Sequence, residues 1–129
     1  MSSNIPADLK YTKSHEWVRT LPDGNVEVGI TDHAQGALGD LVFVDVPEAG
    51  KTLKVGDAFA VVESVKAASD VYAPIAGSVV EGNAALGGQP ELVNSDPYKG
   101  GWIARFKPAG APQGLLTAAE YTAHLAAEG

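Results

Sequence analysis

The stretch that decides the fold reads Val61-Val62-Glu63-Ser64-Val65-Lys66-Ala67-Ala68-Ser69-Asp70-Val71-Tyr72-Ala73-Pro74. Both of its halves are rich in β-branched and aromatic residues, which predicts strands near 58–64 and 69–73 joined by a short turn that carries Lys66. Lys66 is the only basic residue between Lys54 and Lys99, and its immediate neighbours offer no carboxylate for a salt bridge. A lysine raised on a hairpin tip is accessible to a modifying enzyme, although most turn lysines are only solvated charges.

The composition indicates a globular chain and excludes several classes of site. The length of 129 residues fits a single domain over 1–129, with 45% hydrophobic and 19% charged residues. Cysteine is absent, which excludes a disulfide framework, a zinc–thiolate site, an iron–sulfur cluster and a cysteine nucleophile. The net charge of -7 argues against nucleic acid and favours partners that present a positive surface.

The sequence contains no apolar run as long as a membrane span or a signal-peptide core. Residues 1–6 also lack the arginine-rich, amphipathic pattern of an organelle transit peptide. We therefore expect a soluble protein of the bacterial cytoplasm, with the mitochondrial matrix as the alternative.

The segments before the hairpin predict short strands and one short helix. Gly24 lies in a turn over 21–25, where it accepts a positive φ. Asp32 is placed to cap a helix and Gln35 to complete a capping box, while Gly39 ends the helix. Strands are expected at 10–12, 15–20, 26–30 and 41–46, the last apolar enough to be buried.

A weak internal repeat suggests how the strands are arranged. An Ala-Gly step at 49–50 leads through a loop to a strand ending in Ser64, and a second at 76–77 leads to a segment ending in Ser95. The repeat predicts two similar half-sheets packed face to face, with Lys66 at their junction. We therefore expect a mainly β fold, a flattened β-sandwich or barrel with short flanking helices.

The C-terminal part predicts a last strand, a linker and a helix. The strand covers 102–107, with Trp102, Ala104 and Phe106 on one face, and the linker covers 108–114. The helix is expected over about 117–127 and should pack on the sandwich. Its signals are the cap Thr117, the capping-box residue Glu120, the staple of Leu116 with Tyr121, and an apolar stripe at 118, 121 and 125.

No enzyme motif is present. The three histidines, His15, His33 and His124, fall in different elements without metal-ligand spacing, so surface or capping roles are expected. The sequence has no nucleophile elbow, phosphate-binding glycine loop or dinucleotide fingerprint. An exposed Lys66 is also unsuited to Schiff-base catalysis, which needs burial or a cationic neighbour. The remaining possibility is that Lys66 is itself a substrate and carries a prosthetic group.

The segment around Lys66 resembles the lipoylation segment of the glycine cleavage system H protein family. Further segments similar to that family follow in order at 9–11, 14–18, 28–35, 38–40, 42–44, 91–95 and 97–102. This resemblance implies a lipoyl-domain-like β-sandwich with a C-terminal helix, lipoate in amide linkage to Lys66, and a monomer.

The resemblance also implies a carrier that catalyses nothing. Its partners would be glycine decarboxylase (P protein), aminomethyltransferase (T protein), dihydrolipoamide dehydrogenase (L protein) and lipoate-attaching enzymes. Family members fold the loaded arm into a cleft beside the positions of Ser14, Glu16 and Asp70, where a carboxylate holds the amine. Glu63 would help lipoate-attaching enzymes to recognise the hairpin. The plainer alternatives are an exposed strand carboxylate at Glu16 and a solvated strand end at Glu63.

Related carriers and other roles remain as alternatives. A lipoyl domain of a 2-oxoacid dehydrogenase and a biotin carboxyl carrier both lack the elements at 14–17 and 97–102, and biotin domains typically place methionines beside the lysine. A relay that donates lipoyl groups to other proteins, or a binding module with an unmodified lysine, would use the same hairpin. The sequence does not separate these roles.

Overall fold

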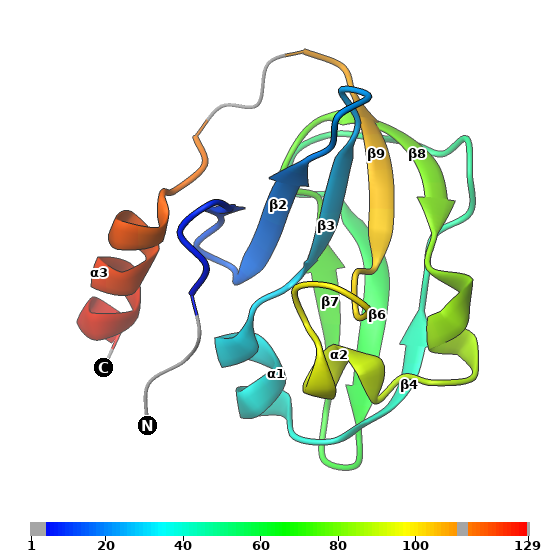
Figure 1. Ribbon diagram of the computed structural model, residues 1–129. Helices are drawn as coiled ribbons and strands as arrows, with labels where there is room; N and C mark the ends of the chain where they lie inside the picture. The colour runs from blue at the N-terminus through cyan, green and yellow to red at the C-terminus, as the bar shows by residue number, and fades with distance from the viewer. Residues whose placement is uncertain (1–4, 111–113, 129) are drawn as a thin grey trace.

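Two antiparallel sheets packed face to face form the body of the molecule (Figure 1). The structure, a computed structural model, describes residues 5–110 and 114–128. The larger sheet contains β1 (Lys10–Tyr11), β2 (Glu16–Thr20), β3 (Val26–Ile30), β9 (Ala104–Pro108), β8 (Gly77–Gly82) and β5 (Thr52–Leu53), in that order. The smaller sheet contains β4 (Leu41–Asp45), β6 (Ala58–Ser64) and β7 (Ala68–Tyr72). The predicted β-sandwich is therefore confirmed.

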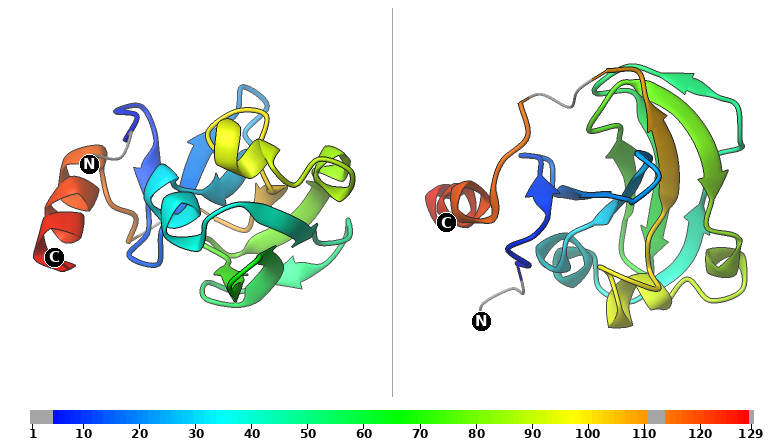
Figure 2. Two further views of the ribbon diagram at one scale, coloured as in Figure 1. Left: turned by 90° about the horizontal axis from the view of Figure 1, so that it is seen from below. Right: turned by 45° about the horizontal axis from the view of Figure 1, so that its top comes forward.

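Short helices lie at the ends of the sheets, and the longest helix lies to one side (Figure 2). They are α1 (Asp32–Leu38), the 3-10 turn η1 (Ala84–Gly87), α2 (Leu92–Ser95) and α3 (Ala118–Glu128). No helix in the described part of the chain has the length and apolar character needed to cross a membrane.

The main core fills the space between the two sheets. Its side chains come from the inward positions of both sheets, as in β9, where Ala104 and Phe106 are fully buried. Phe59 of β6 meets Phe106 edge-on, with ring centroids 5.1 Å apart, an arrangement that aromatic pairs favour. A second apolar cluster joins the N-terminal segment to α3 and contains Leu9, Tyr11, Trp17, Tyr98 and Tyr121.

The hairpin of β6 and β7 follows the sequence prediction closely. β6 has the predicted bounds, whereas β7 both begins and ends one residue earlier than predicted, at Ala68 and Tyr72. Ser64 closes the turn: its amide donates to the Ala67 carbonyl at 2.8 Å, and its hydroxyl accepts the Lys66 and Ala67 amides at 3.3 and 3.1 Å. Because Ala67 already pairs back to Ser64, the second strand starts directly after it.

The cap of α1 differs from the prediction by one residue. Thr31, not Asp32, is the cap, and its hydroxyl accepts the Ala34 amide at 3.2 Å. Gln35 does not complete a capping box with Asp32; its side-chain amide donates to the Asp32 carboxylate at 2.7 Å. Gly39 ends the helix as predicted, with a φ of 85°.

The internal repeat does not correspond to two half-sheets. Residues 92–95 form helix α2 rather than a strand, so the second half of the repeat has no counterpart of β6. The side-chain amide of Asn94 donates to the side-chain oxygen of Gln35 and to the Gly39 carbonyl, both at 2.9 Å, which ties α2 to the end of α1. Lys66 therefore lies at the tip of a hairpin within the smaller sheet and not at a junction between two half-sheets.

The prediction that residues 41–46 form a buried strand is wrong for half of β4. A register shift between Leu41 and Phe43 turns consecutive side chains outward, so Val42 and Phe43 are 55% and 48% exposed. β4 is also an edge strand, paired only with β6. At the last strand, Ala104 and Phe106 share the predicted buried face, but Trp102 precedes β9 and is half-buried.

The start of α3 agrees with its predicted capping box. The Glu120 amide donates to the Thr117 hydroxyl at 3.2 Å, and the Thr117 amide donates to the Glu120 carboxylate at 2.9 Å. Tyr121 is fully buried and Ala118 and Leu125 are partly buried beside it, as the apolar stripe predicts. Part of the predicted linker, 111–113, lies outside the described residues.

Candidate functional site

Lys66 is exposed at the tip of the β6–β7 hairpin, the lowest loop in Figure 1. The preceding Val65 is 80% exposed, and none of the ion pairs in the described part of the chain involves Lys66. The end of α1 lies beside the lysine stem, because a β-carbon on Gly39 would stand 3.8 Å from Lys66 Cε. The amine is therefore accessible and is not neutralised by a neighbouring acid.

Glu16, at the start of β2, is buried rather than exposed, with only 2% of its surface accessible. Its Oε1 accepts hydrogen bonds from the Thr12 and Ser14 hydroxyls, each at 2.6 Å. Its Oε2 accepts the Tyr72 amide of β7 at 3.4 Å. The plainer alternative for Glu16, an ordinary exposed strand carboxylate, is therefore wrong. The carboxylate bridges the larger sheet and the free edge of the smaller one.

Burial raises the pKa of Glu16 above its ordinary value, and the hydrogen bonds from Ser14, Thr12 and Tyr72 oppose that rise without cancelling it. Loss of water from a carboxyl group disfavours its charged form, while donors directed at it favour that form. The turn itself is held by two hydrogen bonds of 3.0 Å, from the Thr12 amide to the Glu16 carbonyl and from the Glu16 amide to the Thr12 hydroxyl.

The outer face of the smaller sheet combines carboxylates with apolar side chains. Cross-strand partners in an antiparallel sheet project to the same side, and two rows cross the three strands. One row contains Phe43, Glu63 and Ala68, and the other contains Asp45, Val61 and Asp70. Glu63 is half-buried and Asp70 is exposed. The hairpin that carries Lys66 therefore presents an acidic, partly apolar face to solvent.

The structure brings some of the sequence-predicted site residues into contact but not all of them. Ser14 and Glu16 are hydrogen-bonded to each other. Asp70 lies on the same strand as Tyr72, the residue whose amide reaches Glu16. Within the described residues, the Asp70 side chain forms no hydrogen bond or ion pair with Ser14 or Glu16. Glu63 lies across the β6–β7 ladder from Ala68.

Sequence reasoning missed a cluster of histidines. His15, His33 and His124 come from the β1–β2 turn, α1 and α3, yet the His15 ring lies 4.8 Å from the His33 ring and 6.0 Å from the His124 ring. All three are half-buried rather than fully at the surface. Spacing along the chain gave no signal of this meeting. Over residues 5–110 and 114–128, no group of three or more His, Cys, Asp or Glu is arranged to hold a metal ion.

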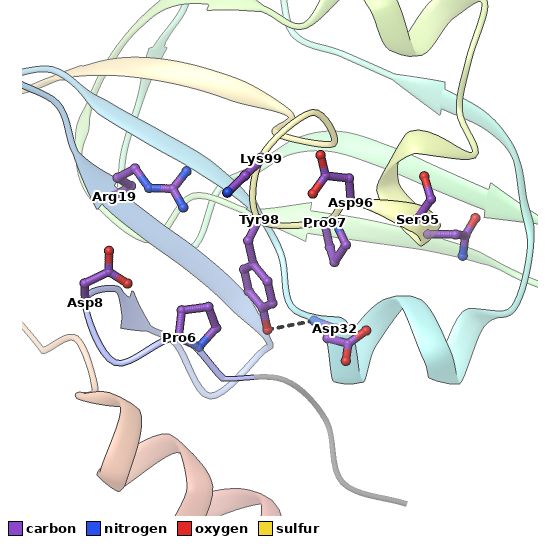
Figure 3. A pocket seen from close by; sticks show the side chains of 10 residues that line it. Pro6, Asp8, Arg19, Asp32, Ser95, Asp96, Pro97, Tyr98 and Lys99 are labelled. Atoms are coloured by element: carbon purple, nitrogen blue, oxygen red, sulfur yellow. Dashed lines mark hydrogen bonds between the residues drawn. The ribbon is translucent and has the colours of Figure 1, made fainter.

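Figure 3 shows a separate pocket of about 370 Å³. Arg19 and Lys99 line it together with the carboxylates of Asp8, Asp32 and Asp96, so charges of both signs face it. The Tyr98 hydroxyl accepts the Asp32 amide at 3.0 Å, and burial raises the pKa of Tyr98 to about 12. The pocket shares no lining residue with the Lys66 hairpin or the Glu16 turn.

Comparison with known proteins supplies the family. A family model described as "Glycine cleavage H-protein" matches residues 9–128, nearly the whole chain. The chain belongs to the glycine cleavage H-protein family. It is therefore a component of the glycine cleavage system, as its sequence resemblance implied.

Relatives in this family match nearly the whole chain. The chain is 60% identical to the glycine cleavage system H protein of Halorhodospira halophila (strain DSM 244 / SL1), over 98% of this chain and 99% of that protein. It is 58% identical to the H protein of Escherichia coli O7:K1 (strain IAI39 / ExPEC), over 95% and 97%. The crystal structure of a glycine cleavage system H protein from Mycobacterium marinum matches with a TM-score of 0.88 at 45% identity, covering 95% of this chain and 99% of that chain.

Proposed function

We propose that the protein is a lipoyl-carrying shuttle in which lipoate is attached to Lys66 by an amide bond. The observation that carries this proposal is an exposed lysine on a hairpin tip in a chain that matches the glycine cleavage H-protein family over residues 9–128. The surroundings of Lys66 fit such a group. Acylation converts the ammonium to a neutral amide, so an apolar ring can rest on protein surface without burying a charge.

The bound dithiolane would accept an aminomethyl group at glycine decarboxylase, deliver it to tetrahydrofolate at the aminomethyltransferase, and be reoxidised by dihydrolipoamide dehydrogenase. The protein would itself catalyse nothing. Lys66 provides a flexible attachment at a tip, and the tether gives the reacting end a high local concentration once a partner docks. The bacterial relatives support a cytoplasmic location, with the mitochondrial matrix as the alternative.

Glu16, Ser14 and Asp70 would hold the amine of the loaded arm. Among the described residues, Glu16 Oε2 accepts one long hydrogen bond, 3.4 Å from the Tyr72 amide, so it retains the capacity to accept a shorter, charge-assisted bond from an ammonium group. The Ser14 and Thr12 hydroxyls hold the other oxygen and so fix the carboxylate. Asp70, exposed on β7, would add a second negative charge beside the arm.

Glu63 would contribute to recognition of the hairpin by lipoate-attaching enzymes. It lies on the outer face of β6 in the row that includes the exposed Phe43. An enzyme that docks on this row would contact an anchoring aromatic ring and a carboxylate a short distance from the target amine.

Aminomethyl loading tests the shuttle function. Lipoylated protein is incubated with glycine and glycine decarboxylase, and the aminomethyl adduct is measured by mass spectrometry. A shuttle gains the adduct and loses it when aminomethyltransferase and tetrahydrofolate are added. Lipoylated protein that gains no adduct, but donates its lipoyl group to another protein, would be a relay and would contradict the proposal.

A further inference from the structure

The β1–β2 turn is held from two sides by alternate residues. Thr12, Ser14 and Glu16 make the carboxylate site described above. The C-terminal segment contacts the residues between and before them, as the backbone of Tyr11 pairs with that of Leu116. Side chains of the turn bond the carboxylate, while His15 and the Lys13 carbonyl face the C-terminal helix.

Side chains of helix α3 contact this segment at several points. The Tyr121 ring stacks on the Tyr11 ring, with centroids 4.7 Å apart and planes 6° from parallel. The Tyr121 hydroxyl lies 2.8 Å from His15 Nδ1. His124 Nε2 lies 3.2 Å from the Lys13 carbonyl oxygen. Tyr121 is fully buried, so the polar contact of its hydroxyl is shielded from water.

His15 is the strained residue of the turn. Among the described residues it is the only non-glycine residue with a positive φ, 75°. A conformation of this kind costs about 1–3 kcal/mol and persists only when surrounding contacts hold it. The hydrogen-bond contacts include the Tyr121 hydroxyl, the Thr12 carbonyl, which accepts the His15 amide at 3.1 Å, and the Thr31 amide, which donates to the His15 carbonyl at 3.0 Å. The rings of His33 and His124 also lie against the His15 ring.

Tyr121 also connects the turn to α1. Its hydroxyl lies 2.7 Å from the hydroxyl of Thr31, the cap of α1. One buried hydroxyl group therefore joins the C-terminal helix, the strained turn and the start of α1. His15 stands between Ser14 and Glu16, so a change in its backbone angles displaces a donor of the carboxylate site, the carboxylate itself, or both.

We propose that Tyr121 of α3 is a positioning residue for Glu16: it holds His15 in its left-handed conformation and thereby fixes the carboxylate and its Ser14 donor. The role in holding a loaded arm rests on the function proposed above, whereas the effect on Glu16 itself does not. Tyr121 acts on Glu16 through the turn, because the side-chain donors to the Glu16 carboxylate are Thr12 and Ser14.

The test compares Tyr121→Phe with the matched control Tyr98→Phe. Both variants remove the hydroxyl of a buried tyrosine whose oxygen is hydrogen-bonded, but the Tyr121 hydroxyl lies against His15 of the turn, whereas the Tyr98 hydroxyl accepts the Asp32 amide of α1. The titration of the Glu16 carboxyl carbon and the amide exchange of residues 14–16 and 72 are measured by NMR on the unlipoylated chain. A merely structural role would lower stability in both variants and leave the Glu16 titration in place.

We expect Tyr121→Phe to speed exchange of the Glu16 and Tyr72 amides roughly threefold to tenfold, the effect of losing one net hydrogen bond. The pKa of Glu16 should fall toward its ordinary range as water reaches the carboxyl group. Tyr98→Phe should leave both the Glu16 pKa and the amide exchange rates unchanged. His15→Asn removes the imidazole at a position where asparagine tolerates positive φ, and it should shift both readouts in the same direction. A Glu16 titration that is unchanged in Tyr121→Phe and His15→Asn would overturn the proposal.

A second readout separates this proposal from the proposed function. Lipoylated protein is loaded with the aminomethyl group, and its release of formaldehyde and ammonia to water is timed. We expect faster release in both Tyr121→Phe and Glu16→Gln. Faster release in Glu16→Gln alone would overturn the positioning role for the arm. Suppose that release is unchanged in Glu16→Gln but the pKa of Glu16 shifts in Tyr121→Phe. The proposed role of Glu16 in holding the arm is then wrong, and the positioning of Glu16 by Tyr121 stands.

Discussion

Two side chains of opposite charge have opposite surroundings in this protein. Lys66 is exposed on a turn and forms none of the ion pairs in the described residues. Glu16 is buried and accepts hydrogen bonds from two hydroxyl groups and one amide. An exposed lysine is suited to modification, and a buried, hydrogen-bonded carboxylate is suited to fixed recognition. Substitution of each residue should therefore have a different kind of effect.

Replacement of Lys66 should abolish carrier chemistry without affecting the fold. Lys66→Arg removes the acylatable amine but keeps the charge, and surface substitutions of this kind change the free energy of unfolding by less than about 0.5 kcal/mol. Lipoylation assays and urea unfolding measure the two effects. Lys54→Arg, also at an exposed lysine, is the control and should be lipoylated normally. A large loss of stability in Lys66→Arg would contradict the exposed tip.

Glu16 should make stability depend on pH. Because burial raises its pKa above the ordinary value of 4.5, the native protein holds this proton more tightly than the unfolded chain does. The corresponding stability is complete below the ordinary pKa and is lost as the pH rises through the raised, native pKa. Glu16→Gln should therefore gain stability relative to the parent chain as the pH rises from about 4.5.

Urea unfolding of both chains at a series of pH values measures this difference. Glu91→Gln, at an exposed carboxylate, is the control. A stability difference between Glu16→Gln and the parent chain that stays constant from about pH 4 to about pH 8 would show that Glu16 does not titrate differently on folding.

Among the strands and helices, local signals were sufficient where a single segment determines its own structure. The β6–β7 hairpin and the capping box of α3 depend on residues close in sequence, and both formed as predicted. Features set by distant contacts were missed. Helix α2 is tied to α1 through Asn94, and the bulge of β4 exposes side chains that alternation alone would bury.

The candidate site shows the same division. Lys66 was predicted because its segment has a recognisable sequence. The burial of Glu16 was not, because the amide that donates to its second oxygen belongs to Tyr72 of β7, far along the chain. The histidine cluster likewise depends on how the C-terminal helix packs against the β1–β2 turn. Such meetings follow from tertiary packing and leave no periodic signal in the sequence.

Two glycines should respond to alanine in opposite ways. A β-carbon on Gly29 of β3 would stand 2.7 Å from the Trp17 indole nitrogen, and Trp17 is fully buried and donates to the Pro97 carbonyl. Gly29→Ala should therefore cost about 1–3 kcal/mol through overpacking.

Gly36 lies inside α1 with open space around its β-carbon position. Gly36→Ala should stabilise the protein by about 0.5–1 kcal/mol, because alanine loses less conformational freedom than glycine in a helix. Thermal or urea unfolding measures both variants. A stabilising Gly29→Ala would contradict the close packing of β3 against Trp17.

The protein as a whole carries a net charge of -7, and the face beside Lys66 is acidic through Asp45, Glu63 and Asp70. The negative electrostatic potential of this face should steer partners that present positive charge toward it, and salt should screen that attraction. We expect the rate of aminomethyl loading at limiting carrier to fall as ionic strength rises, with little change at saturation. A rate that is independent of salt in both regimes would show that charge does not guide the encounter.

The most direct test of the lipoyl-carrier account is the intact mass with peptide mapping of protein purified from its own host with lipoate available. The account predicts one lipoyl group per chain, located on Lys66. An unmodified Lys66 under these conditions, or a lipoyl group on another lysine, would contradict it.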